Sequence, residues 1–119
     1  MERSPRRYRG DTSGPPRAQE ERLAGKLGGR RRSGSGSNPM APGDVVVPEL
    51  LVEAKQTKHA SISVTLAWLN KISREAALEG KEPALAIEIR GGDLDPHCER
   101  DWVAIPARVL RRLLDRERG

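Results

Sequence analysis

The chain has 119 residues, with 22 Lys and Arg against 17 Asp and Glu and a formal net charge of +5. This length allows one modest domain, and Cys98, the only cysteine, excludes an intrachain disulfide and gives no sign of an oxidising compartment. No stretch offers the ~20 apolar residues of a membrane-spanning helix, and no apolar run follows the basic N-terminus as in a signal peptide. We therefore expect a cytoplasmic protein with no membrane segment.

Positive charge is concentrated in the first 43 residues. They hold 8 of the 12 Gly, 5 of the 9 Pro, and 10 Lys and Arg against 4 Asp and Glu, whereas residues 44–119 carry 12 basic and 13 acidic residues. Such a segment cannot bury enough apolar surface to offset its ordering entropy, and its charge favours a polyanionic partner, for which nucleic acid is the obvious candidate. We predict a disordered basic tail over residues 1–15 and a single domain over residues 16–119.

A helix and a basic loop begin the predicted domain. Pro16 suits a first helical position and Gly28-Gly29 ends the helical pattern, so we predict a helix over residues 16–28. Residues 29–43 follow as a basic Gly/Ser-rich loop, and residues 44–119 form the core. The loop is either a flexible linker, which its composition favours, or a segment whose backbone approaches a phosphate closely.

A short hairpin is expected next. Val45-Val46-Val47 forms one strand, Pro48-Glu49 the connection, and residues 50–55 the second strand. Because side chains alternate faces along a strand, one face carries Leu51, Glu53 and Lys55 and the other carries Leu50, Val52 and Ala54. The second strand is therefore apolar on one face and charged at the carboxyl end of the other.

The remaining elements are a helix, two strands and a helix. Apolar residues at spacings of three and four predict a helix that ends at Gly80, with the stripe Ile62, Leu66, Leu69, Ile72 and Ala76. Lys71 and Glu75 lie off this stripe as an i,i+4 ion pair. Residues 84–89 alternate as a strand, with one face formed by Leu85, Ile87 and Ile89; residues 102–105 form a last strand, and Pro106 starts a helix. This order predicts an α/β fold with helices packed on a mixed sheet.

The hairpin carries residues suited to phosphodiester hydrolysis, a reaction in which bound metal ions can activate water and neutralise charge. The Asp44 and Glu53 carboxylates, with the Ala54 carbonyl, are oxygen ligands of the kind that Mg²⁺ or Mn²⁺ prefers. Lys55 could orient the attacking water or stabilise charge on the phosphoryl oxygens. The alternative is a surface Glu–Lys salt pair. Three features together favour a site: the pair ends an apolar strand, an acid lies one hairpin earlier, and a basic segment precedes it.

These residues resemble a known motif. Gly43-Asp44 with Glu53-Ala54-Lys55 is similar to the motif of the PD-(D/E)xK nuclease superfamily, with Gly43 in the place of the proline that names it. Residues 18–105 resemble the archaeal and phage Holliday-junction-resolvase-like branch, since Lys55-Gln56-Thr57, the helix over residues 69–77 and the strand over residues 84–89 are also similar. The resemblance implies a restriction-endonuclease-like fold, a mixed β-sheet flanked by helices.

The resemblance also implies an activity and its residues. It indicates a Mg²⁺-dependent endodeoxyribonuclease that cuts branched DNA such as Holliday junctions, acts as a homodimer and, if encoded by a phage, works in the host cytoplasm. The first helix would supply a further catalytic acid, Glu21, with Glu20 as the competitor. The DNA contacts would come from Arg30, Arg31, Arg32, Ser33, Ser35, Thr57 and Lys58. The alternatives are a non-catalytic basic DNA-binding protein and a basic protein that binds an acidic partner.

Overall fold

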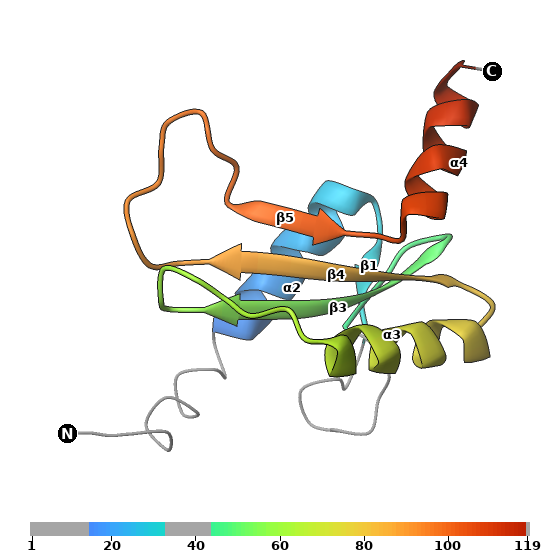
Figure 1. Ribbon diagram of the computed structural model, residues 1–119, viewed down its shortest axis with the longest axis horizontal. Coiled ribbons are helices and arrows are strands. Elements are labelled where there is room, and N and C mark those ends of the chain that lie inside the picture. The colour runs from blue at the N-terminus through green and yellow to red at the C-terminus, as the bar shows by residue number, and fades with distance from the viewer. Residues whose placement is uncertain (1–14, 33–43, 119) are drawn as a thin grey trace.

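The computed structural model describes residues 15–32 and 44–118, and a five-stranded sheet lies at its centre (Figure 1). The strands lie in chain order: β1 (Arg30–Arg31), β2 (Val45–Val46), β3 (Leu50–Thr57), β4 (Glu82–Ile89) and β5 (Asp101–Ala104). β3 and β4 are parallel, and the other neighbours are antiparallel. Three helices complete the described residues: α2 (Pro15–Leu27), α3 (Leu66–Leu78) and α4 (Ala107–Arg118). The predicted α/β class and the mixed sheet with flanking helices are confirmed.

Helices cover both faces of the sheet. On one face, Leu23 and Ala24 of α2 form a core with the buried side chains of Val45, Val47, Val52, Ala84 and Ala86. On the other face, Ile72 and Ala76 of α3 pack on Leu51. Figure 1 shows α2 behind the sheet and α3 in front of it. Because side chains alternate faces along a strand, the two helices pack against different residues of the same strands.

The predicted hairpin and its alternation are confirmed. Val45 pairs with Val52 and Val46 with Leu51, so β2 and β3 are joined by the expected tight connection. Val52 belongs to the core beneath α2 and Leu51 to the core beneath α3. Since side chains two residues apart share a face, Glu53 lies on the α3 side of the sheet.

The predicted strand over residues 84–89 is confirmed as part of β4, and one of the predicted helices differs. Ala84, Leu85 and Ala86 are all buried, because β4 is parallel to β3 and lies inside the sheet, between two helical layers. Helix α3 begins at Leu66, so Ile62 is not helical. The extended Thr65 caps the helix, and its Oγ1 accepts a hydrogen bond from the Trp68 N–H at 3.1 Å.

Strand β1 lies inside the segment that was expected to be a loop. Gly28 ends α2 with φ +71°, a conformation that favours glycine, and a side chain on Gly29 would collide with the Val46 carbonyl. The chain then passes directly into the pairing of Arg30 with Val46. The pairing continues as the Arg32 N–H donates to the Asp44 carbonyl at 2.8 Å. The two arginines of this strand have no apolar pattern that would predict it. Its backbone pairing with β2 stabilises it.

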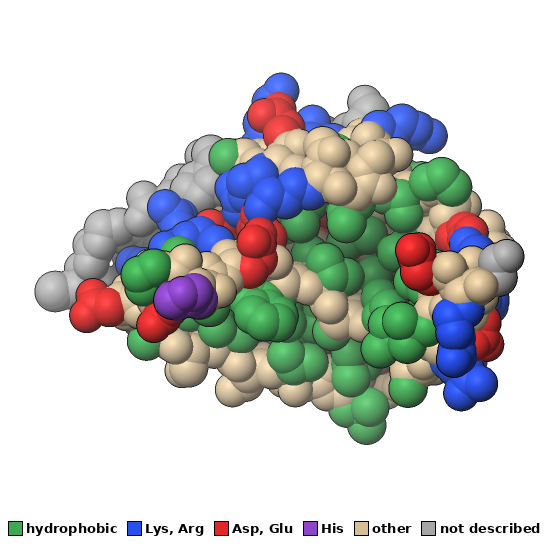
Figure 2. Space-filling model, turned by 90° about the horizontal axis from the view of Figure 1, so that it is seen from above, with side chains coloured by type: hydrophobic (Ala, Val, Ile, Leu, Met, Phe, Trp, Pro, Cys, Tyr) green, Lys and Arg blue, Asp and Glu red, His purple; other side chains and the backbone are tan. Residues whose placement is uncertain are grey.

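Helix α4 is attached to the rest of the protein mainly along one side. Arg112 pairs with Glu82 at 3.0 Å and Arg116 with Glu49 at 2.6 Å, while Val109 is buried. Figure 2, viewed from the β5 side, shows hydrophobic side chains gathered between charged groups. The large hydrophobic residues exposed on β5 and α4 are Trp102, Val103, Leu110, Leu113 and Leu114. Among the described helices, none has the length and apolar character needed to cross a membrane.

Candidate active site

The β2–β3 hairpin brings Asp44 close to Glu53 and Lys55. Asp44 precedes Val45, the partner of Val52, and its N–H donates to the Val52 carbonyl at 2.7 Å, which sets it beside the stretch of β3 that leads into Glu53. The Asp44 carboxylate accepts a hydrogen bond from the Ala54 N–H at 2.7 Å. Lys55 follows two residues after Glu53, and its Nζ lies 3.5 Å from a Glu53 carboxylate oxygen. The three residues thus lie together in the structure; their role as a site stays a prediction.

Asp44 is in an environment that opposes its negative charge. Burial raises its pKa, the negative charge of Glu53 raises it further, and the pKa reaches about 6 despite the hydrogen bond from Ala54. Glu20 adds a smaller effect in the same direction. Near neutral pH the ionised site therefore concentrates negative charge in a partly buried position, which an added cation would relieve.

Helix α3 completes the surroundings of Glu53 and Lys55. The Lys55 Nζ lies 4.6 Å from the centroid of the Trp68 ring, a cation–π distance. Lys71 Nζ lies 3.6 Å from the second carboxylate oxygen of Glu53 and 3.0 Å from Glu75. The Glu53 side chain is only 15% exposed. The Glu53 carboxylate is therefore in contact with two ammonium groups, that of Lys55 on the strand and that of Lys71 on the helix.

The first helix supplies Glu20, and not Glu21, to this region. Glu20 is buried, pairs with Arg31 at 2.9 Å, and interacts electrostatically with Glu53; burial raises its pKa. Glu21 is exposed and pairs with Arg17 at 3.3 Å on the outer side of the helix. The choice of Glu21 over Glu20 thus does not fit the structure, because adjacent helical residues point about 100° apart and only one can face the sheet.

Several residues expected to contact DNA have partners within the protein. Arg31 pairs with Glu20, and Arg32 pairs with Glu79 at 2.8 Å. Thr57 is buried and its hydroxyl accepts a hydrogen bond from the His59 N–H at 3.1 Å, so this side chain is not presented to a ligand. Arg30 and Lys58 are exposed. Ser33 and Ser35 lie outside the described residues.

Comparisons with known proteins were made for the whole chain. No family model, no curated protein and no solved structure matches it. Any assignment of function therefore depends on the residues of the chain and on their geometry.

The donor atoms are compatible with Mg²⁺ or Mn²⁺. In a β-strand the N–H and C=O of one residue point toward the same neighbouring strand, so the Ala54 carbonyl lies on the side where its N–H meets Asp44. Within residues 15–32 and 44–118, no group of three or more His, Cys, Asp and Glu side chains is arranged to hold a metal ion. The oxygen donors in this region are the Asp44 and Glu53 carboxylates and the Ala54 carbonyl, which are of the kind that hard cations prefer.

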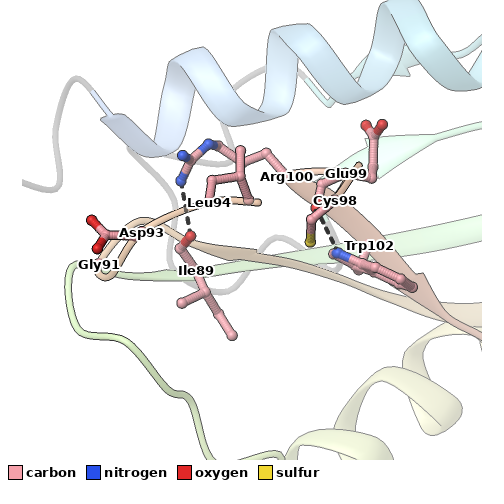
Figure 3. Close-up of a pocket in the computed structure, with 8 residues that line it drawn as sticks. All are labelled: Ile89, Gly91, Asp93, Leu94, Cys98, Glu99, Arg100 and Trp102. Atoms are coloured by element: carbon pink, nitrogen blue, oxygen red, sulfur yellow. Dashed lines mark hydrogen bonds between the residues drawn. The ribbon is translucent and has the colours of Figure 1, made fainter. Parts of the chain in front are cut away.

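A separate cavity lies in the region between β4 and β5 (Figure 3). It has a volume of about 210 Å³, and its lining includes Ile89, Leu94, Cys98 and Trp102. Hydrogen bonds shape its walls: Arg100 donates to the Ile89 carbonyl at 2.9 Å, and the Trp102 indole N–H donates to the Glu99 carbonyl at 2.7 Å. Asp44, Glu53, Lys55 and Lys71 do not line this cavity, so it is separate from the candidate active site.

Sequence reasoning missed three residues near the site. Gln19 is buried and its amide donates to the Lys55 carbonyl at 2.9 Å, which holds α2 against the end of β3. Lys71 appeared in the sequence only as part of an i,i+4 ion pair with Glu75. For Trp68 the sequence favours a core or interface position over a base-stacking surface, and it does not indicate the contact with Lys55, which is 13 positions away.

Proposed function

We propose that the protein is a metal-dependent DNA endonuclease that hydrolyses phosphodiester bonds, with a restriction-endonuclease-like fold of the PD-(D/E)xK type. The observation that carries the proposal is the closeness of Asp44, Glu53 and Lys55 on the β2–β3 hairpin. The Asp44 carboxylate accepts a hydrogen bond from the Ala54 N–H at 2.7 Å, and the Lys55 Nζ lies 3.5 Å from Glu53. A structural salt pair does not account for a second, partly buried carboxylate whose pKa is raised to about 6.

Each residue has a role in this proposal. Asp44 and Glu53 would hold Mg²⁺ or Mn²⁺, which supplies Lewis-acid stabilisation and an activated water when bound. Lys55, beside Glu53, orients the attacking water or stabilises the charge that develops on the phosphoryl oxygens. Glu20, which interacts electrostatically with Glu53 and Asp44, is the proposed acid of the first helix. Branched DNA as the substrate and the homodimer belong to the same proposal.

Cleavage assays with matched variants test the proposal. Labelled linear, flap and four-way DNA are incubated with the protein and Mg²⁺ or EDTA. We expect Mg²⁺-dependent cleavage that Glu53→Gln lowers about 100-fold or more, because the variant loses a charged ligand at the reacting centre. Glu20→Gln should also lower the rate, whereas Glu21→Gln, one position along the same helix, should leave it unchanged.

The assay also separates the competing function. A non-catalytic DNA-binding protein would bind all three DNAs in EDTA, cleave none with Mg²⁺, and keep its affinity after Glu53→Gln. Absence of metal-dependent cleavage by the wild-type protein on every DNA, or full activity of Glu53→Gln, would overturn the nuclease proposal.

A further inference from the structure

Helix α3 brings a second lysine to the carboxylate of Glu53. Lys55 Nζ lies 3.5 Å from one Glu53 oxygen, and Lys71 Nζ lies 3.6 Å from the other. The two lysines come from different elements, β3 and α3. Lys71 has a side chain that is 48% exposed, against 15% for Glu53. The Lys71 ammonium is therefore at the solvent side of the site, where an approaching anion arrives first.

Acidic residues hold Lys71 in this position. Glu75, one helical turn later, pairs with it at 3.0 Å, and the Glu53 carboxylate is a second anionic partner at 3.6 Å. An ammonium has three N–H donors, so a phosphate oxygen can be added while the contact with Glu75 is kept.

The same helix fixes the first lysine. The Trp68 ring, one turn before Lys71, lies 4.6 Å from Lys55 Nζ. Trp68 and Lys71 are three positions apart, so they share one side of α3. The helix thus supplies the Lys71 ammonium and holds the Lys55 ammonium of β3 through Trp68, so that two ammonium groups lie beside Glu53.

We propose that Lys71 is a phosphate-binding residue, which together with Lys55 takes a backbone phosphate of the nucleic acid at the opening of the Asp44–Glu53 site. This proposal rests on the proposed function. Lys71 lies outside the motif, which ends at Lys55. Lys71 is also the basic residue of α3 that contacts Glu53 on the sheet.

Lys71→Met tests the proposal, with Arg74→Met as the control. Arg74 is exposed on the same helix, so its variant removes the same charge at a position three residues away. DNA affinity is measured by fluorescence anisotropy in EDTA at several KCl concentrations, and cleavage gives kcat and KM with Mg²⁺. We expect Lys71→Met to weaken binding about tenfold and to reduce the salt slope by about one. KM should rise more than kcat falls, and Lys71→Arg should restore most of the affinity.

Binding of Mn²⁺ without DNA, followed by calorimetry, separates phosphate binding from support of Glu53. Loss of a positive charge beside Glu53 should leave Mn²⁺ affinity unchanged or higher in Lys71→Met. DNA affinity equal to that of Arg74→Met, or a loss of Mn²⁺ affinity together with DNA affinity, would overturn the proposal. Absence of cleavage by the wild-type protein would instead overturn the nuclease proposal, so the two failures are distinguishable.

Discussion

Asp44 combines burial, a hydrogen bond and an adjacent negative charge in one side chain. Its carboxylate accepts the Ala54 N–H at 2.7 Å, which favours the ionised form, yet burial and Glu53 together raise the pKa to about 6. The raised pKa means that the ionised Asp44 carboxylate lowers the stability of the folded protein, because it is buried close to a second acid. Such a cost is typical of sites built for a ligand.

Asp44→Asn should therefore stabilise the protein at alkaline pH. The folded-state pKa of about 6 lies above the unfolded value near 3.9, so the cost of ionising Asp44 is fully present above pH 6 and disappears below about pH 4. Asparagine keeps an oxygen to accept the Ala54 N–H. We expect the free energy of unfolding in urea to rise by about 1–3 kcal/mol at pH 8, with no gain at pH 4. Lower stability of the variant at pH 8 would contradict the assigned pKa.

At the scale of elements, an ion network joins α2 to the distant edge of the sheet. Arg22 makes two hydrogen bonds of 2.7 Å to Asp101 on β5 and a 3.1 Å contact to Glu88 on β4, and Lys26 reaches Asp101 at 2.9 Å. The Asp101 side chain is only 4% exposed, and its hydrogen bond to Arg22 lowers its pKa to about 2. The network fixes α2 across the sheet, which also positions Glu20 beside the hairpin.

Arg22→Ala should be strongly destabilising because it leaves two buried carboxylates without their main partner. Breaking such a pair typically costs about 3–5 kcal/mol, and we expect a loss of this size in urea unfolding at pH 7. The stability that comes from the lowered pKa of Asp101 is fully present above the unfolded value near 4 and is lost as the pH falls toward the folded value of about 2, so the destabilisation should shrink over that range. Arg17→Ala, which removes an exposed i,i+4 pair on the same helix, should cost less than about 1 kcal/mol. Equal losses in the two variants would contradict this role of Arg22.

The elements that sequence predicts well are those with local signals. The hairpin follows from alternation around Pro48-Glu49, and α2 ends at Gly28 as expected. The pairing of Arg22 with Asp101 joins residues 79 positions apart, which no periodicity reveals. β1 has no apolar pattern of its own and depends on β2 for its existence. The acids and the lysine of the hairpin could therefore be predicted from the sequence. The residues that α2 and α3 add to the candidate site could not, because tertiary packing brings them there.

At the scale of the whole molecule, much of the N-terminal positive charge within residues 15–32 has acidic partners in the fold. The ion pairs join Arg17 to Glu21, Arg22 and Lys26 to Asp101, Arg31 to Glu20, and Arg32 to Glu79. These cations contribute to stability, and binding a polyanion through them would require partners to be exchanged. Residues 1–14 contain Arg3, Arg6, Arg7 and Arg9 against two acids, and they lie outside the described residues.

Replacing these four arginines by serine separates DNA affinity from catalysis. Each Lys or Arg that neutralises a phosphate contributes about 0.9 to the slope of log affinity against log salt, so four contacts would contribute about 3–4. We expect the variant to bind four-way DNA more weakly, with a slope reduced by no more than this amount. The rate of cleavage at saturating DNA should be unchanged, because Asp44, Glu53 and Lys55 are intact. Anisotropy across a KCl series gives the slope, and single-turnover cleavage at saturation gives the rate. If the rate at saturation fell with the affinity, these arginines would act in the chemical step, and a site confined to the hairpin and its two helices would be insufficient.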